Sequence, residues 1–352
     1  MTKKKIRDPI TVGYRSIKPG ERAYVELDMP GLFSQSGTIM PVHVIHGKRD
    51  GPVLFLSAAL HGDEINGVEI IRRVLKHRSL NRLKGTLIAV PVVNVYGFLY
   101  KSRYLPDRRD LNRSFPGSQQ GSMASRTANL FLTEIVSKCT HGIDLHTGAI
   151  HRDNLPQVRA LMDDPETERM AHAFRAPVIL NTEIVDGSLR AEVEKMGIPV
   201  IVYEAGEALR FDEVSIRAGT RGVIAIMREL GLLPRTRSKK QFKSMLGKSS
   251  SWVRAPKSGV LRSMKMLGAT VNKGDLLGIV FDPFGEAEEN VLCPADGIII
   301  GRTNIPLVNE GEALFHIARF KNADALADTL EDFQYEMDPT TDDKPPPEPP
   351  IV

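Results

Sequence analysis

The chain has 352 residues, of which 41% are hydrophobic and 26% charged, a composition typical of a globular protein with room for more than one domain. The net charge of +4 is too small to indicate nucleic acid as a partner, and no apolar run approaches the roughly 20 residues that cross a bilayer. The two cysteines form no CxxC motif and the basic N-terminus precedes no apolar segment, so we expect a cytoplasmic protein without disulfides.

Strand and helix patterns alternate along most of the chain. Residues 1–50 place β-forming residues between glycines, which predicts an N-terminal β-rich segment joined to the next domain. Short apolar runs such as GPVLFLSAAL and GTLIAVPVVN are typical of strands buried on both faces. The stretch after Glu64 has its apolar side chains on one stripe of a helix. This alternation predicts an α/β catalytic domain over residues 51–245, with a mixed, mainly parallel sheet flanked by helices.

The pattern changes near Pro234, where a basic, serine-rich stretch predicts a linker. Two half-repeats, APKSGV with VNKGDLL and CPADGI with VNEGEAL, predict an all-β barrel-sandwich domain over residues 246–320, similar to biotinyl and lipoyl domains. An MKM tripeptide surrounds Lys265, but it lies inside the first half-repeat rather than on the turn between the halves. We therefore predict no covalent carriage. Residues 321–352 turn helical, then acidic and proline-rich, which predicts a disordered end.

Polar side chains follow two of the buried strands. His61 and Glu64 lie in the motif HGDE at a strand-to-helix junction, and His146 ends the strand IDLHTG with Asp144 on the same face. Ligands of open α/β sheets bind beyond the carboxyl ends of the strands. A catalytic zinc takes three protein ligands and keeps one position open. We predict that His61, Glu64 and His146 bind one Zn²⁺ per chain, with Asp144 bonded to a ligating imidazole.

Two further stretches suggest substrate chemistry. The loop SRYLPDRRDLNRSFPG holds Asn112 beside Arg113, and this pair can bind a carboxylate because a guanidinium donates two hydrogen bonds to it. Another arginine of the loop is a candidate for stabilising an oxyanion. Glu204 follows the apolar strand VIVY and precedes Ala-Gly, so it lies at the carboxyl end of a strand as a candidate general base.

These four motifs, in this order, resemble the succinylglutamate desuccinylase/aspartoacylase family of the zinc carboxypeptidase-like group. The resemblance covers about residues 51–233 and extends to the β-rich region after residue 250. It implies the three zinc ligands named above, and it leaves Arg108 and Arg109 as competitors for the role of Arg103, because the spacing to DLNR varies within the family. The other implied roles are Glu204 as base and proton shuttle, Arg103 as the group that polarises the scissile carbonyl, Asn112 and Arg113 as binders of the substrate carboxylate, and Arg190 as a further substrate-binding arginine.

The resemblance also has a departure. Aspartoacylases carry a substrate-contacting tyrosine after a VNE-like stretch, whereas VNEGEALFHIA has none, so specificity for acetyl-aspartate is not implied. The predicted function is a zinc-dependent deacylase that cleaves the amide bond of a small N-acylated, carboxylate-bearing substrate such as an N-acyl amino acid. A metallocarboxypeptidase acting on short peptides and a non-catalytic zinc-binding module stay open as alternatives. The expected partner is a small molecule rather than nucleic acid or a membrane, and homo-oligomerisation stays open.

Overall fold

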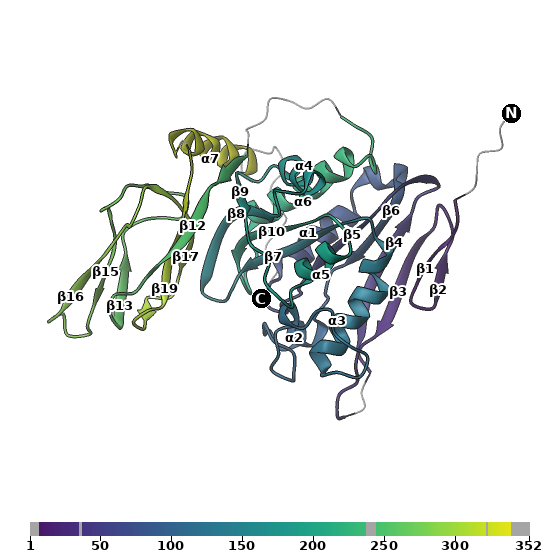
Figure 1. Cartoon of the computed structure of the whole chain (residues 1–352), viewed down its shortest axis with the longest axis horizontal. Coiled ribbons are helices and arrows are strands. Elements are labelled where there is room, and N and C mark those ends of the chain that lie inside the picture. The colour runs from purple at the N-terminus through teal and green to yellow at the C-terminus, as the bar shows by residue number, and fades with distance from the viewer. Residues whose placement is uncertain (1–6, 35–36, 237–243, 322, 339–352) are drawn as a thin grey trace.

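A mixed sheet of 13 strands runs through most of the computed structural model, which describes residues 7–34, 37–236, 244–321 and 323–338 (Figure 1). Its main path is β12-β19-β17-β8-β10-β7-β5-β6-β4-β3, with β9 and β11 branching from β8, and β14 from β17. The strands of this sheet are β3 (Arg22–Asp28), β4 (Ile39–His46), β5 (Arg49–Ala58), β6 (Lys84–Val90), β7 (His141–Gly148), β8 (Arg152–Ala160), β9 (Val178–Asn181), β10 (Val200–Glu207), β11 (Met245–Gly247), β12 (Ser249–Arg254), β14 (Thr270–Val271), β17 (Gly297–Thr303) and β19 (Ala313–Arg319).

The centre of this sheet is parallel and its flanks are largely antiparallel. Strands β6, β5, β7 and β10 pair in parallel, whereas β4 runs antiparallel to β6, and β8 runs antiparallel to β10. Parallel pairs need long crossovers, and the central strands are joined by segments that contain helices. The mixed α/β sheet is confirmed, but it is mainly parallel only in its centre. A separate hairpin, β1 (Ile10–Val12) with β2 (Arg15–Ile17), precedes it.

Helices cover both faces of the sheet, and each face has its own hydrophobic core. Leu54 and Leu56 of β5 belong to the core that also contains side chains of α1, α4 and α6, while Phe55 belongs to the core with side chains of α3 and α5. This alternation follows the two-residue period of a strand that is buried on both faces. The helices are α1 (Asn66–Leu75), α2 (Val95–Leu99), α3 (Met123–Glu134), α4 (Pro165–Phe174), α5 (Leu189–Lys195), α6 (Glu213–Glu229) and α7 (Ala323–Met337), with the 3-10 turns η1 (Arg78–Arg82), η2 (Leu111–Arg113) and η3 (Val136–Lys138).

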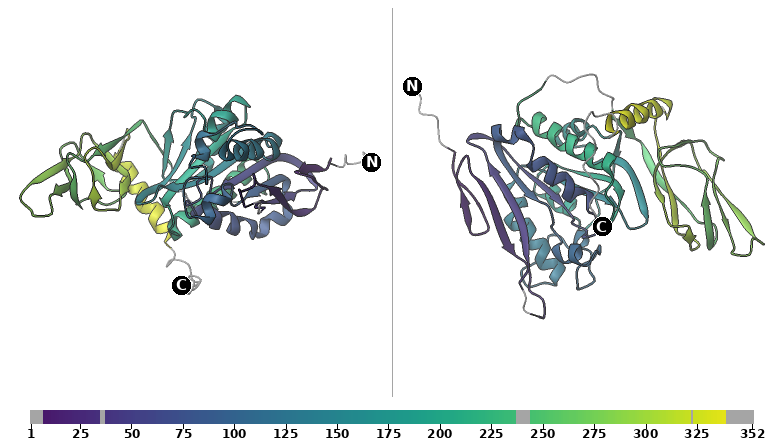
Figure 2. Two further views of the ribbon diagram at one scale, coloured as in Figure 1. Left: turned by 90° about the horizontal axis from the view of Figure 1, so that it is seen from below. Right: turned by 180° about the vertical axis from the view of Figure 1, so that it is seen from behind.

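Residues 244–321, the C-terminal β region, extend from one end of the molecule (Figure 2). A four-stranded sheet in the order β16-β15-β13-β18 lies in this region, and β12, β19 and β17 continue the large sheet because β17 pairs with β8. The barrel-sandwich architecture stays a prediction. The strands of the smaller sheet are β13 (Gly259–Ser263), β15 (Leu276–Phe281), β16 (Glu288–Leu292) and β18 (Leu307–Val308).

The predicted linker and the predicted C-terminal tail are only partly described by the structure. The C-terminal end of the predicted linker forms β11 and the start of β12, and each of these strands pairs with a strand of the large sheet. Residues 237–243 lie outside the described residues. Helix α7 packs on α6 and contributes Phe333 and Met337 to a core cluster. Of the predicted tail, residues 321–352, residues 322 and 339–352 lie outside the described residues. Among the helices that are described, none combines the length and hydropathy that a membrane-spanning segment needs.

Candidate metal centre and active site

The HGDE motif forms the turn between β5 and α1, as the strand and helix patterns predict. His61 and Glu64 lie in this turn, and their exposed fractions are only 4% and 2%. The neighbouring backbone comes very close, because a Cβ on Gly62 would lie 2.0 Å from the carbonyl carbon of Gly97. Only glycine fits such a contact. Gly62 therefore allows the chain to fold tightly and to bring both polar side chains to the carboxyl edge of β5.

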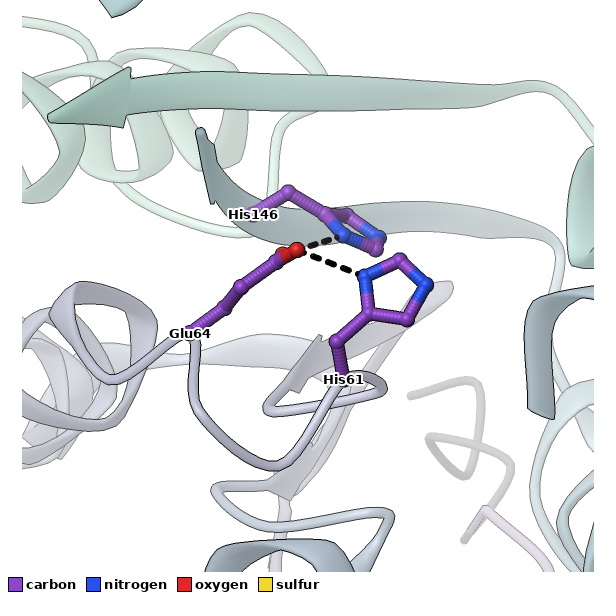
Figure 3. A group of neighbouring side chains, drawn as sticks. All are labelled: His61, Glu64 and His146. Carbon is purple, nitrogen blue, oxygen red and sulfur yellow. Dashed lines mark hydrogen bonds and ion pairs between the residues drawn. The ribbon is translucent and has the colours of Figure 1, made fainter. Parts of the chain in front are cut away.

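His61, Glu64 and His146 form a group whose potential ligand atoms all lie within 4.8 Å of one another (Figure 3). The Nδ1 atoms of the two histidines each lie 2.7 Å from a different oxygen of Glu64. Their other ring nitrogens also face carboxylates: His146 Nε2 is 2.7 Å from Asp144 Oδ2, and His61 Nε2 is 3.3 Å from Asp110 Oδ1. This is the usual environment of a metal-binding imidazole, which offers one nitrogen to the ion and bonds a carboxylate through the other.

The electrostatics of this group favour a cation between the imidazoles. Burial lowers the pKa of His146, but the carboxylates of Asp144 and Glu64 raise it well above its ordinary value. Burial also lowers the pKa of His61, but Glu64 and Asp110 raise it above its ordinary value. The two rings lie with centroids 5.0 Å apart in this buried site. Two imidazole nitrogens and one carboxylate oxygen form a donor set that fits zinc.

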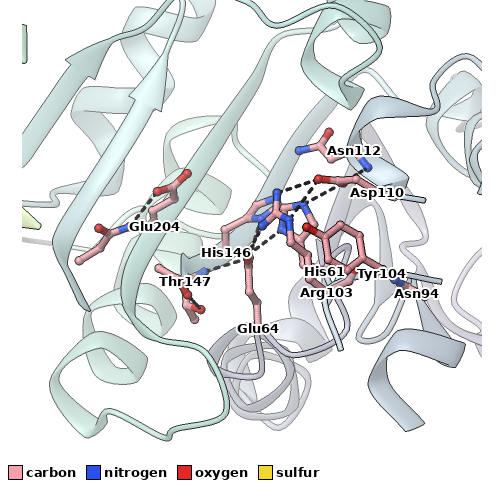
Figure 4. Close-up of polar contacts among 12 residues, drawn as sticks. His61, Glu64, Asn94, Arg103, Tyr104, Asp110, Asn112, His146, Thr147 and Glu204 are labelled. Atoms are coloured by element: carbon pink, nitrogen blue, oxygen red, sulfur yellow. Dashed lines mark hydrogen bonds and ion pairs between the residues drawn. The ribbon is translucent and has the colours of Figure 1, made fainter. Parts of the chain in front are cut away.

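Glu204 lies beside the metal-ligand group on the neighbouring strand. It is the register partner of His146 in the parallel β10–β7 pair, and both residues line the same cavity. Its Oε2 accepts a hydrogen bond of 3.0 Å from Asn154 Nδ2 and lies 2.8 Å from Arg159 Nη2. Figure 4 shows Glu204 together with His61, Glu64 and His146. Two side chains of β8 thus hold the Glu204 carboxylate in place.

The EAG motif after this strand has a backbone explanation. The pairing register of β10 shifts directly after Glu204, and Gly206 has a φ of +76°. A Cβ on Gly206 would also lie 2.6 Å from Asn66 Nδ2, an atom that donates to the carbonyl of Ala205. Glycine is therefore needed at the irregularity where the pairing register of β10 shifts.

Among the three loop arginines that the sequence leaves open, Arg103 is the one that faces the metal-ligand group. Its Nη1 lies 3.4 Å from Glu64 Oε1, and its Nε and Nη2 bond Asp110 Oδ2 at 3.1 and 2.9 Å. Arg108 and Arg109 are exposed, and neither lines the cavity. Asp110, which sequence reasoning missed, links Arg103 to the imidazole of His61. Its position directly before the LNR stretch was the available signal.

The predicted carboxylate binders line the same cavity. Asn112 and Arg113 belong to η2, and Asn112 Oδ1 accepts a hydrogen bond of 2.9 Å from the backbone of Leu189. Arg113 is exposed, and its Nη1 donates to the carbonyl of Asn112 at 2.6 Å. Arg190 on α5 bonds both the hydroxyl and the carbonyl of Thr182, at 2.6 and 2.7 Å. The structure therefore brings the predicted site residues around one cavity.

This cavity has a volume of about 350 Å³ and includes side chains that sequence reasoning missed. Among them are Asn154, Arg152 and Arg159 of β8, and Trp252 of β12 in the C-terminal β region. The Trp252 ring stacks on His316 with centroids 4.6 Å apart, and the Arg152 guanidinium lies 5.3 Å from it. Burial, together with the charge of Arg159, lowers the pKa of His316 to about 4. No motif marks these residues, because sheet pairing alone brings β8 and β12 to the site.

Comparison with known proteins covers nearly the whole chain. A model of the succinylglutamate desuccinylase/aspartoacylase catalytic domain matches residues 50–230. The N-alpha-acetyl-L-2,4-diaminobutyric acid deacetylase of Halomonas elongata is 26% identical over 312 residues, which cover 85% of this chain and 91% of that protein.

Solved structures show the same fold. A succinylglutamate desuccinylase/aspartoacylase from Rhodobacter sphaeroides has a TM-score of 0.78 at 23% identity, and the match covers 92% of this chain and 98% of the other. The product-bound ectoine utilization protein EutE (DoeB) from Ruegeria pomeroyi also has a TM-score of 0.78, at 25% identity, and covers 90% and 97%. The shared fold therefore includes much of the C-terminal β region as well as the catalytic sheet.

Proposed function

The chain belongs to the succinylglutamate desuccinylase/aspartoacylase family, and we propose that it is a zinc-dependent deacylase. The proposed reaction is hydrolysis of the amide bond of a small N-acylated substrate that carries a carboxylate, such as an N-acyl amino acid. The convergence of His61, Glu64 and His146 in the cavity that Glu204 also lines carries this proposal. The name of the Halomonas elongata relative, a deacetylase of an N-acetylated amino acid, supports the substrate class.

In this proposal, His61, Glu64 and His146 hold one Zn²⁺, while Asp110 and Asp144 orient the two imidazoles. When bound, such an ion acts as a Lewis acid and lowers the pKa of its bound water to about 7. The backbone N–H of Thr147 donates to Glu64 Oε2 at 3.2 Å and helps to keep that carboxylate in place. Three protein ligands leave a coordination position open for catalysis.

Glu204 acts as the general base and then as the general acid. Both contacts from β8 are made to its Oε2, which leaves Oε1 to take a proton from the attacking water. The same carboxyl group returns the proton to the amine that leaves. Because Glu204 and His146 are register partners on adjacent strands, the base lies next to the metal-ligand group.

The arginines of the cavity have two different roles in this proposal. Arg103, with its Nη1 at 3.4 Å from Glu64, polarises the scissile carbonyl and stabilises the negative charge that develops on its oxygen. Asn112, Arg113 and Arg190 line the same cavity and bind the substrate carboxylate, to which guanidinium groups can donate paired hydrogen bonds.

A substrate panel tests the proposal. Zinc-loaded protein is incubated with N-acetyl-L-2,4-diaminobutyrate, N-acetyl-aspartate, N-succinyl-glutamate, an N-acetylated polyamine and several dipeptides, and release of free amine is followed. We expect hydrolysis of at least one N-acyl amino acid. The Glu204→Gln variant should bind zinc as the wild type does, and should lose about 100- to 10,000-fold in turnover because the proton acceptor is gone.

The other outcomes separate the alternatives. Hydrolysis of dipeptides without any N-acyl amino acid would identify a metallocarboxypeptidase, which would use the same residues. Zinc-loaded protein that hydrolyses no member of the panel would be a non-catalytic zinc-binding module. Full activity of Glu204→Gln would refute the assignment of the base.

A further inference from the structure

We propose that Asn154 and Arg159 position Glu204 for proton transfer, and that the C-terminal β region keeps Asn154 in place through Gly301. Asn154 and Arg159 are positioning residues in this proposal, since they act through Glu204. The inference rests on the proposed function, in which Glu204 is the base. It assigns to the C-terminal β region a part in turnover.

Asn154 and Arg159 both contact the same oxygen of Glu204. Asn154 Nδ2 donates to Glu204 Oε2 at 3.0 Å, and Arg159 Nη2 lies 2.8 Å from the same atom. Asn154 is buried, with 6% exposure, and the side chain of Glu204 is 17% exposed. Two groups that hold one oxygen from β8 restrict rotation of the carboxylate and direct the other oxygen. A base must lie within hydrogen-bond reach of the proton that it takes, so this orientation affects the rate directly.

Strand β8 lies between the strand that carries Glu204 and the C-terminal β region. On one side β8 pairs with β10, which carries Glu204, and on the other side it pairs with β17 of the C-terminal β region. Asn154 is the register partner of Gly301 on β17. Further contacts hold the two regions together: Arg152 Nη1 donates to the carbonyl of Ala313 at 2.7 Å. The side chain that orients the base thus lies directly at the junction with the C-terminal β region.

Gly301 leaves space for the side chain of Asn154. A Cβ at this position would lie 2.9 Å from Asn154 Oδ1 and 3.2 Å from His316 Cβ. Real Cβ atoms essentially never come as close as the first of these distances, so a larger residue must displace the Asn154 amide or separate the strands. Glycine at position 301 is therefore the feature of β17 that lets Asn154 reach Glu204.

Three variants test the positioning role: Asn154→Ala, Arg159→Gln and Gly301→Ala. The substrate is the member of the panel above that the wild type hydrolyses fastest, and zinc content and Tm are measured for each variant. We expect kcat to fall about 10- to 100-fold in each, because small misplacement of a catalytic group is costly, with KM and zinc content close to the wild type. Gly31→Ala is the matched control, because its Cβ would meet no atom within 4 Å.

A double-mutant cycle tests the path from Gly301 to Glu204. If Gly301→Ala acts by displacing Asn154, adding it to Asn154→Ala should cost nothing further in kcat. Fully additive losses would show that Gly301 acts elsewhere, for example through His316, and would overturn this part. Wild-type kcat in Asn154→Ala and Arg159→Gln would overturn the positioning role itself. A loss of zinc in parallel with kcat would indicate a role in metal binding instead.

Crystal structures of the wild type and of Asn154→Ala separate this proposal from the proposed function. We expect the Glu204 carboxylate to rotate in the variant. An unchanged orientation of the Glu204 carboxylate would refute the inference even if the wild type is an active deacylase. Conversely, an inactive wild type whose Glu204 still rotates when Asn154 is removed would refute the deacylase assignment and leave the contact between the two side chains standing.

Discussion

Asp144 Oδ2 lies 2.7 Å from Nε2 of His146, two residues further along β7. The other Asp144 oxygen accepts a hydrogen bond of 2.7 Å from Ser57 Oγ, and the residue is only 1% exposed. A buried carboxylate that is held on both oxygens fixes the orientation of the ring that it bonds.

We therefore expect Asp144→Asn to weaken zinc binding about 10- to 100-fold without unfolding the protein. The amide keeps the shape of the carboxylate but loses the charge that makes the imidazole a better ligand. Competition with a chelator of known affinity measures the change. Asp153→Asn, which alters a carboxylate outside the cavity, is the control and should bind zinc as tightly as the wild type. An affinity unchanged in Asp144→Asn would contradict the proposed role.

Arg103 should be distinguishable from its two neighbours by kinetics. Arg103→Met removes the guanidinium that lies 3.4 Å from Glu64, and we expect kcat to fall about 100- to 1000-fold, as for other oxyanion-stabilising groups. Arg108→Met and Arg109→Met change exposed side chains of the same loop and should leave kcat near the wild-type value. If either control loses as much activity as Arg103→Met, the carbonyl-polarising group has been assigned to the wrong arginine.

Trp252 should contribute to substrate binding from the C-terminal β region. Its ring is stacked on His316 at 4.6 Å and forms part of the cavity wall. Removing an aromatic side chain from such a wall costs roughly 0.5–1.5 kcal/mol beyond the loss of buried area, so Trp252→Ala should raise KM at least about 2- to 10-fold. Steady-state kinetics with zinc content as a control measures this, and Trp252→Phe should recover part of the loss. An unaltered KM in Trp252→Ala would exclude contact with the substrate.

Asp153 should make stability depend on pH. Burial, together with the charge of the Asp212 carboxylate, raises the pKa of Asp153 to about 6, whereas an unfolded chain has an aspartate pKa of about 3.9. Between these values the folded state binds the extra proton, so this contribution to the free energy of unfolding falls as pH rises from about 4 to about 6. Above that window the ionised carboxylate costs roughly 1–2 kcal/mol, after allowance for its partial exposure.

Asp153→Asn removes this cost. We expect the variant to be more stable than the wild type at pH 8 and equally stable at pH 4, where Asp153 is protonated in the folded protein. Urea denaturation at the two pH values measures the difference. The same difference at both pH values would show that the effect comes from packing rather than from the charge.

The sequence by itself determined the local features of the site. The strand-to-helix turn that holds His61 and Glu64 follows from an apolar run, a glycine and a helical stripe, all within 20 or so neighbouring residues. The approach of His146 was also predictable, because the carboxyl ends of parallel strands meet at one edge of a sheet.

Only the tertiary structure decided which other side chains reach that edge. Arg103 faces Glu64 because Asp110 bonds its guanidinium, and a loop with three arginines does not encode that choice in their spacing. Asn154 and Trp252 arrive through the pairing of β8 with β10 and of β12 with β19. Strand pairing joins segments that are distant in the chain, and backbone hydrogen bonds leave no local signature of the partner, because every residue offers a carbonyl acceptor and every residue type except proline an N–H donor.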